Sequence, residues 1–209
     1  DLYNAGYLPR AIINYLALLG WSPESNEEFF TLEELKQQFK ISRITKSPST
    51  YDIKKLQWIN SHYIKQLSNE ELFALTISHL KNNYYVEEKS ENWLEELILL
   101  YREQLSYGEE IVELTKMFFK DDIIFNEEEK SILEEEAVNN TLTTFKDQLI
   151  NIKDWTVEDI TECINKTKEI AGVKGKLLYM PIRVKITGEM HGPELPLTIY
   201  LLGDRKSVV

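Results

Sequence analysis

Apolar residues in this chain recur every three or four positions, and they almost nowhere alternate with polar residues. Spacing by three and four places side chains on one face of an α-helix, whereas strict alternation is typical of a β-strand. Two segments open with helix-capping pairs, Thr31 with Glu34 and Ser68 with Glu71. Gly (8) and Pro (6) are scarce among the 209 residues, which disfavours a turn-rich β architecture. We therefore predict an all-α fold.

Helix starts and stops can be placed from single residues. Pro9 and Gly20 delimit a helix that is apolar nearly all round, so we expect it to be deeply buried. Asp52 is a suitable N-cap for a helix in which Leu56 and Trp58 are expected to anchor the chain to the core. A short helix is expected to start at Pro181. Further helices are predicted at about 31–39, 68–80, 92–105, 109–119, 127–138, 142–150, 156–172 and 195–203.

The sequence contains no recognisable active site. Its one cysteine, Cys163, excludes a disulfide framework, and its three histidines lie far apart without a metal-binding spacing. Gly-rich phosphate loops and the nucleophile elbow are missing from the sequence. No apolar run approaches the roughly 18 residues that a membrane span needs. We expect no catalytic residue, no metal site and no membrane partner in this chain.

Positive charge is concentrated in two islands of an otherwise acidic chain, whose formal net charge is -11. Residues 43–66 hold five Lys or Arg and one acid, and residues 174–185 hold four Lys or Arg and no acid. An acidic body repels polyanions in general, while two basic islands can hold one in a fixed orientation. The alternative is an acidic solvated surface with ordinary variation in the placement of lysine.

The first island divides between a loop and the start of a helix. Pro48 ends any helix that approaches it, so Arg43, Lys46 and Ser47 are expected on a loop. Lys54 and Lys55 would begin the next helix. Free backbone N–H groups at a helix start form a natural seat for a phosphate. We predict a phosphate-binding position there.

Three stretches resemble the bacterial glutamyl-tRNA synthetases. They are GYLPRAIINYLALLGWSP (6–23), SRITKSPSTYDIKKLQWINSHYI (42–64) and KGKLLYMPIRVKITGEMHGPELPLTIYLLG (174–203), in that order and over about a third of the chain. The glutaminyl relatives read the anticodon with β-barrels, which this chain shows no pattern for, and a truncated relative lacks the anticodon domain. The chain begins with Asp1 and enters a helix almost at once, so we interpret it as a piece of a longer protein.

The resemblance implies an enzyme that attaches glutamate to tRNA(Glu) with ATP and Mg²⁺. The catalytic domain of the family precedes these stretches, and neither of its ATP-binding motifs is present here. The chain would then hold a helical domain that contacts the inner corner of the tRNA (1–67) and an all-helical anticodon-binding domain (68–209), the latter in two subdomains (68–150 and 151–209). The resemblance also implies a monomer in the cytoplasm.

The resemblance assigns roles to particular residues. The tRNA backbone would be contacted by the basic residues of the first island and one serine, and the anticodon by residues of the second island and the turn after it. Those are Arg43, Lys46, Ser47, Lys54 and Lys55 for the backbone, and Arg183, Pro193 and Leu195 for the anticodon. The alternatives are a salt bridge from Arg183 to the acidic body, and turn geometry and core packing for Pro193 and Leu195.

Gln104 departs from the pattern of the family. It occupies a position where glutamate-specific members carry an Arg that reads the third anticodon base, and members that also charge tRNA(Gln) tend to lack that Arg. Arg offers a fixed fork of donors, whereas Gln offers one donor group and one acceptor. We hypothesise that Gln104 tolerates either C or G, and that the parent enzyme also charges tRNA(Gln). The competing interpretation of the whole chain is a helical scaffold whose acidic face binds a basic protein.

Overall fold

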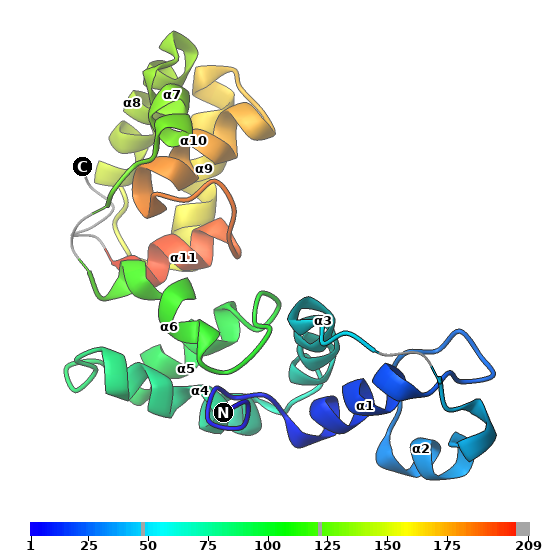
Figure 1. Cartoon of the computed structure of the whole chain (residues 1–209). Helices are drawn as coiled ribbons and strands as arrows, with labels where there is room; N and C mark the ends of the chain where they lie inside the picture. Colours follow the sequence, from blue (N-terminus) through cyan, green and yellow to red (C-terminus); the bar gives the residue numbers. More distant parts are fainter. Residues whose placement is uncertain (47–48, 121–122, 204–209) are drawn as a thin grey trace. The chain divides into compact units, whose positions relative to one another are not determined.

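The computed structural model describes residues 1–46, 49–120 and 123–203 (Figure 1). Every regular element in these ranges is a helix, and the only strand-like feature is an isolated bridge between Trp21 and Ile44. The predicted all-α fold is confirmed. The chain divides into two compact units, Asp1–Leu114 and Thr115–Val209.

The first unit contains two groups of packed helices. In one group α1 (Pro9–Gly20) packs against α2 (Leu32–Gln38) and α3 (Ile53–Ile64), and the short helix η1 (Ile41–Arg43) lies between α2 and α3 in the sequence. In the other group α4 (Asn69–Asn83) packs against α5 (Glu91–Leu100) and α6 (Glu110–Leu114).

Side-chain caps explain where several of these helices begin. Thr31 and Glu34 form the predicted capping box of α2, and Ser68 and Glu71 form that of α4. In each box the first residue accepts a hydrogen bond from the third backbone N–H of the helix, and the glutamate bonds back to the cap. The predicted cap of α3 by Asp52 is also present. These three starts are set by local sequence alone.

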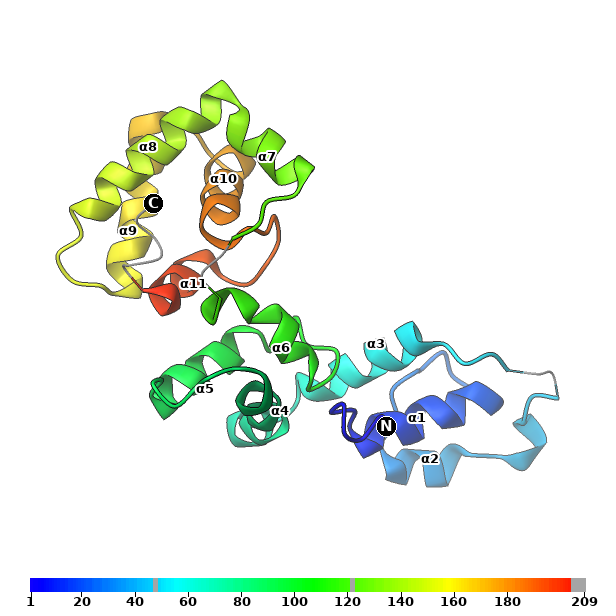
Figure 2. The ribbon, with the colours of Figure 1, turned by 60° about the vertical axis from the view of Figure 1, so that its left-hand side comes forward.

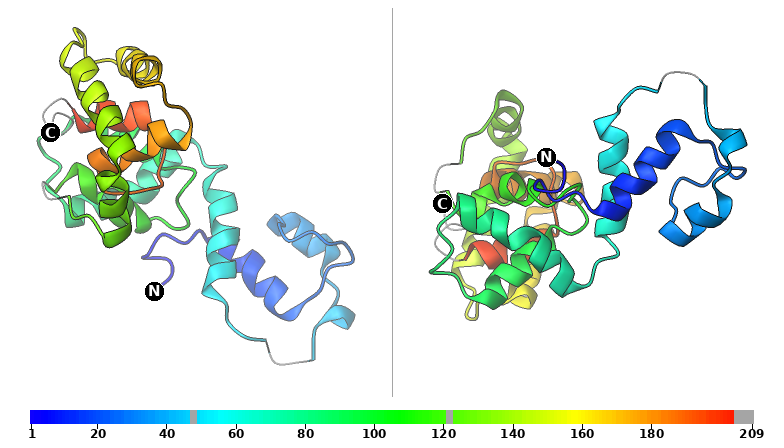
Figure 3. Two further views of the ribbon diagram at one scale, coloured as in Figure 1. Left: turned by 90° about the horizontal axis from the view of Figure 1, so that it is seen from above. Right: turned by 60° about the horizontal axis from the view of Figure 1, so that its bottom comes forward.

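Asn60 joins three segments of the first unit. Its Oδ1 accepts a hydrogen bond from the backbone N–H of Leu8 at 2.8 Å, and its Nδ2 donates one to the carbonyl of Ser106 at 2.6 Å. Figure 3 shows the N-terminal segment, in dark blue, next to α3. Because Asn60 is fully buried, both hydrogen bonds are shielded from water and fix the ends of these segments on α3.

Two predictions of burial in this unit are wrong. Ile13 and Leu16 of α1 are 43% and 56% exposed, because α1 packs through one side only, on α2 and α3. Leu56 is fully buried, as predicted, but Trp58 is 47% exposed. On α3 the core face is formed by Leu56, Ile59 and Tyr63, at helical spacing, and Trp58 lies off that face.

The second unit is a bundle around an apolar core (Figure 2). It contains η2 (Lys116–Phe118), α7 (Glu127–Glu134), α8 (Glu136–Ile150), α9 (Val157–Ala171), α10 (Lys176–Thr187) and α11 (Leu195–Leu202). Helix α8 packs against α9, α10 packs against α7 and α8, and α11 packs against α9 and α10. The core between them is formed by Phe145, Leu149, Ile160, Cys163, Ile164, Leu178, Ile182, Ile186, Leu195 and Ile199.

Several predicted helix bounds differ from the observed ones. Helix α10 begins at Lys176, five residues before the predicted start, and Pro181 lies inside it. A proline there removes one backbone hydrogen bond, but the buried Leu178 and Ile182 hold the helix on both sides of it. The break between α7 and α8 falls at Glu135, and α5 ends at Leu100.

The predicted domain boundaries differ from the division into compact units. The predicted boundary at residues 67–68 lies between α3 and α4, inside the first unit, and that at residues 150–151 lies between α8 and α9 of the second. Both boundaries stay predictions, because they were drawn between regions of expected function and not between compact units.

Candidate nucleic-acid interface

Arg43 fastens the loop that follows α1. Its Nε donates a hydrogen bond to the carbonyl of Ser22 at 2.6 Å, and its Nη2 donates one to that of Pro23 at 2.7 Å. Backbone hydrogen bonds from Ser22 to Arg43 and from Thr45 to Gly20 close the same contact. Two of the five guanidinium N–H groups thus have a structural use, and the rest of this exposed side chain faces outward.

The start of α3 is closed by the chain's own carboxylate. Oδ1 of Asp52 accepts hydrogen bonds from the backbone N–H groups of Lys54 and Lys55 at 2.9 and 3.2 Å. A phosphate at these two groups would compete with a fixed negative charge. The prediction that free N–H groups here seat a phosphate is therefore wrong for Lys54 and Lys55, although it stays open for their side chains.

The lysines of the first island are not equivalent. Nζ of Lys55 forms an ion pair with Glu28 at 2.6 Å, in which the two side chains are 40% and 43% exposed. Lys46 and Lys54 are exposed, and neither ammonium group pairs with an acid in the parts of the chain that the structure describes. Ser47 lies outside the described residues. Two lysines thus remain available for a polyanion at this surface.

An aromatic stack lies against the outer side of α3. The ring of Phe29 stacks on His62 with centroids 3.7 Å apart and contacts Trp58 with centroids 4.6 Å apart. Burial, assisted by the charge of Lys65, lowers the pKa of His62, so its imidazole is neutral at neutral pH. The sequence did not reveal this stack, because Phe29 is brought to α3 from a loop about thirty residues away.

The second island supplies a fixed turn in the second unit. Nη2 of Arg183, on α10, donates a hydrogen bond to the carbonyl of Pro193 at 2.7 Å. A Cβ at Gly192 would lie 2.8 Å from Nη1 of the same arginine, so the turn passes close to the guanidinium. Gly188 ends α10 at φ 69°, a conformation that favours glycine. We call residues 188–195 the Arg183 turn.

The side chains of Pro193 and Leu195 face the core. Both are buried, and Leu195 is 3% exposed in the apolar core of the second unit. The alternatives to anticodon contact, which were turn geometry and core packing, therefore describe where these two side chains lie. The structure brings Arg183 and Pro193 together through the hydrogen bond from the guanidinium to the Pro193 carbonyl.

Gln104 follows the end of α5. The side chain is half-buried, and its Oε1 is buried without a hydrogen-bond partner among the described residues. The nearby Arg102 has a structural use, because it donates hydrogen bonds to the carbonyl of Leu67 at 2.5 Å and to Oδ1 of Asn69 at 2.6 Å. Arg102 therefore ties α5 to the start of α4, whereas Gln104 holds an unpaired acceptor.

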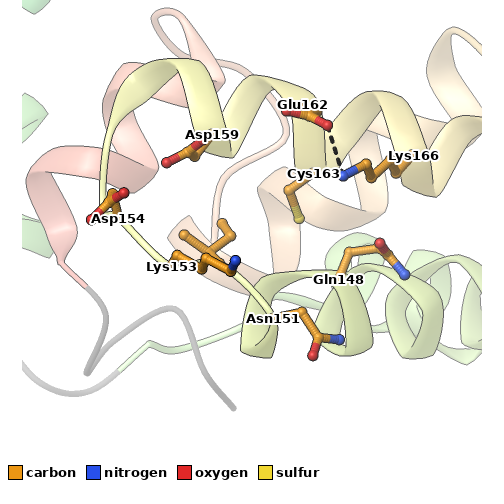
Figure 4. A pocket seen from close by; sticks show the side chains of 9 residues that line it. Gln148, Asn151, Lys153, Asp154, Asp159, Glu162, Cys163 and Lys166 are labelled. Carbon is orange, nitrogen blue, oxygen red and sulfur yellow. Dashed lines mark ion pairs between the residues drawn. The ribbon is translucent and has the colours of Figure 1, made fainter.

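A pocket of about 270 Å³ lies between α8 and α9, away from all of these residues (Figure 4). Its lining mixes charges of both signs, including a 2.7 Å ion pair between Lys166 and Glu162. Burial raises the pKa of the Cys163 thiol to about 12, so it stays protonated and unreactive. No group of three or more metal-ligating side chains occurs among the described residues. This pocket offers neither a nucleophile nor a polyanion site.

None of the helices in the described ranges has the length and apolar character needed to cross a membrane.

Comparison with protein families identifies the second part of the chain. Residues 71–208 match the model of the anticodon-binding domain, a range that includes Gln104, Arg183 and the Arg183 turn. The chain belongs to the anticodon-binding domain family. Residues 1–58 match a second model, the catalytic domain of class I tRNA synthetases (E and Q). We expected these residues to follow the catalytic domain, and the family model instead includes them.

Curated relatives of this chain are glutamate–tRNA ligases. That of Bacillus pumilus (strain SAFR-032) is 47% identical over 204 residues, which are 96% of this chain and 42% of the relative. That of Bacillus subtilis (strain 168) is 44% identical over 207 residues, 97% of this chain and 43% of the relative. This chain thus spans about two fifths of the length of these relatives. The expected resemblance to glutamyl-tRNA synthetases is confirmed.

A solved structure shows the same arrangement of helices. The glutamate tRNA ligase of Elizabethkingia meningosepticum CCUG26117, in complex with its amino acid, matches 100% of this chain and 41% of its own with a TM-score of 0.80 and 26% identity. The first family match ends at residue 58 and the second begins at residue 71, and the predicted boundary at residues 67–68 falls between them.

Proposed function

We propose that this chain is the tRNA-binding, anticodon-recognising part of a longer glutamate–tRNA ligase, which attaches glutamate to tRNA(Glu) with ATP. The observation that carries the proposal is the anticodon-binding family match over residues 71–208, within which Arg183 holds a preformed turn. The names of the relatives support the amino acid and the reaction.

The first unit would supply contacts to the tRNA backbone. Phosphate contacts position a protein on a nucleic acid, and base contacts give it specificity. The exposed Lys46 and Lys54 suit phosphate contacts, since neither is neutralised by a neighbouring acid in the described structure. Lys55 and Arg43 contribute less to this role because each already holds part of the fold. Ser47 remains part of the proposal on the resemblance alone.

The Arg183 turn would meet the anticodon. Bases of a single-stranded loop can splay out and be read by hydrogen bonds and by stacking on guanidinium planes. Arg183 donates a hydrogen bond to the carbonyl of Pro193, and this bond fixes the plane of the guanidinium before any RNA binds. We assign base contact to Arg183 and to the turn at Pro193, and we assign Leu195 the support of that turn from the core.

Gln104 would leave the third anticodon base weakly specified. Because its Oε1 is buried and unpaired, the side chain offers a base only the amide NH₂ as a donor group. A single donor group tolerates either C or G more readily than the fixed donor fork of an arginine does. We propose that the longer enzyme charges tRNA(Gln) as well as tRNA(Glu). Gln104→Arg in that enzyme should reduce charging of tRNA(Gln) selectively. Negligible charging of purified tRNA(Gln) by the unmodified enzyme would contradict this part of the proposal.

The remaining features of the parent enzyme belong to the same proposal. ATP and Mg²⁺ would serve the catalytic part of the longer enzyme, and no residue of this chain is assigned to them. We propose a monomer in the cytoplasm, as the resemblance implies.

Salt dependence of tRNA binding tests the proposal directly. The 209-residue chain should bind an unmodified tRNA(Glu) transcript, and the logarithm of the affinity should fall linearly with the logarithm of salt concentration, because bound phosphates release counterions. An acidic scaffold for a basic protein partner would bind no tRNA at any salt concentration, and that result would replace the proposal.

A further inference from the structure

The outer face of α3 carries more than the lysines already assigned. Lys54, Trp58 and Lys65 follow one another at spacings of four and seven residues, so they lie along one side of the helix. All three are exposed, and Trp58 is 47% exposed. An exposed tryptophan with a lysine on either side has no explanation in the packing of α3, which buries Leu56, Ile59 and Tyr63 instead.

Trp58 is held in place although it is exposed. Phe29 contacts its ring with centroids 4.6 Å apart, and Phe29 is itself stacked on His62. Aromatic contacts of this kind hold a side chain without covering it. The tryptophan therefore presents a supported ring surface to its surroundings, and a ligand that stacks on it loses little conformational freedom of the protein.

The charge beside Trp58 selects the kind of ligand. Lys54 has no acidic partner among the described residues, and Lys65 has only an exposed pair with Glu103 at 3.1 Å. Exposed pairs of this kind are weak and exchange partners readily. The two lysines are about 16 Å apart along the helix, a span of a few nucleotides. In a chain of formal net charge -11, a positive strip of this kind is complementary to a polyanion.

We propose that Trp58 stacks on an unpaired nucleobase of the bound RNA, while Lys54 and Lys65 contact phosphates that lie a few nucleotides apart, one on each side of that base. Stacking on an aromatic side chain suits any base, because every base has a π-face. This inference rests on the proposed function, and it adds a stacking contact at Trp58, a residue to which no RNA contact has been assigned.

Substitutions at Trp58 separate stacking from charge. For the 209-residue chain and an unmodified tRNA(Glu) transcript, Trp58→Ala should weaken binding about 5- to 150-fold, the range expected for loss of base stacking. The slope of affinity against salt should stay unchanged, because tryptophan carries no charge. Trp58→Phe, which keeps an aromatic ring on Phe29, should bind within about threefold of the unmodified chain.

A matched control and a spectroscopic readout complete the experiment. Tyr85→Ala removes an aromatic ring that is 70% exposed and lies outside the α3 face, and it should leave binding unchanged. Stacking should also quench tryptophan fluorescence when tRNA is added, and Trp58→Phe should remove that quenching while binding persists. Trp58 is one of four tryptophans, so the difference between the two titrations isolates its signal.

The outcomes distinguish this inference from the function on which it rests. If the chain binds tRNA and Trp58→Ala binds equally well, the stacking inference is overturned while the proposed function stands. If Trp58→Phe shows the same quenching as the unmodified chain, Trp58 contributes nothing to the signal, and the inference is again overturned. If the unmodified chain binds no tRNA, the proposed function fails first and the stacking contact fails with it.

Discussion

Lys54 of the first basic island and Arg183 of the second are held in opposite ways. On α3 the unpaired Lys54 stands on the surface and takes no part in the core. In the Arg183 turn, the guanidinium donates to the carbonyl of Pro193, and Leu195 is 3% exposed in the core. Lys54 offers an exposed, unpaired charge, and the Arg183 turn offers a preformed shape.

This difference matches two different tasks in binding a nucleic acid. Mobile lysines can follow phosphates whose positions vary little with sequence, whereas a base must be met by groups whose positions are already fixed. Substitutions in the α3 face should therefore change affinity with little effect on folding, and substitutions in the Arg183 turn should change both. The following predictions test that contrast, from the largest effect to the smallest.

Leu195→Ala should damage the fold of the second unit. Removing this buried side chain leaves a cavity in the core, and we expect the free energy of unfolding to fall by about 2–5 kcal/mol. Urea denaturation followed by circular dichroism measures the loss. Leu177→Ala, on a side chain that is 52% exposed, should change it by less than about 0.5 kcal/mol. Equal effects would show that Leu195 is not part of the core.

Lys46→Glu combined with Lys54→Glu should weaken tRNA binding without unfolding the protein. We expect an affinity loss of about tenfold for every tRNA sequence, and a salt slope smaller by about 2, because two phosphate contacts are lost. The control combines Lys36→Glu with Lys130→Glu, which changes the net charge equally at lysines already paired with glutamates. If the control weakens binding as much, the effect belongs to net charge and not to these two lysines.

Asp52 separates capping from phosphate binding at the start of α3. Asp52→Ala removes the acceptor of two backbone N–H groups, so the free energy of unfolding should fall by about 1 kcal/mol. Asp52→Asn keeps an acceptor and removes the negative charge, so it should retain most of the stability and bind tRNA at least as well as the unmodified chain. Weaker tRNA binding by Asp52→Asn would contradict this account of the helix start.

His62 should make a small contribution to the pH dependence of stability. Its pKa is lowered in the folded state, chiefly by burial, so the unfolded chain takes up a proton first as the pH falls. The stability that this group contributes is fully present above the unfolded pKa near 6.5 and decreases as the pH drops below it. Thermal unfolding between pH 7.5 and 5.5 should show this decrease, and His62→Gln should reduce it. An identical pH profile for His62→Gln would show that His62 makes no such contribution.

The parts of the fold that the sequence predicted correctly are those determined within a few residues. The capping boxes at Thr31 and Ser68 and the cap at Asp52 each involve neighbours two or three positions apart. Periodicity also placed Leu56 in the core, because its row of apolar residues continues along α3. The all-helical class follows from such local signals summed over the chain.

The parts that could not be predicted depend on distant segments. Trp58 looked like a core residue until Phe29, from a loop before α2, was seen to support it at the surface. Arg43 looked free for a phosphate, but it binds carbonyls twenty residues earlier in the chain. Arg183 is held by the carbonyl of Pro193, which lies in a turn that no periodicity describes. The sequence named side chains of the candidate site, but it could not predict which hydrogen-bond and packing partners hold them.

Affinity for two transcripts that differ only in the anticodon tests the central claim most directly. The 209-residue chain should prefer the transcript with the tRNA(Glu) anticodon by about tenfold or more over one in which all three anticodon bases are replaced, and Arg183→Gln should reduce that preference. Both transcripts should show the same salt slope, since their phosphates are the same. Equal affinity for the two transcripts would contradict the account, because the chain would then bind RNA without reading its anticodon.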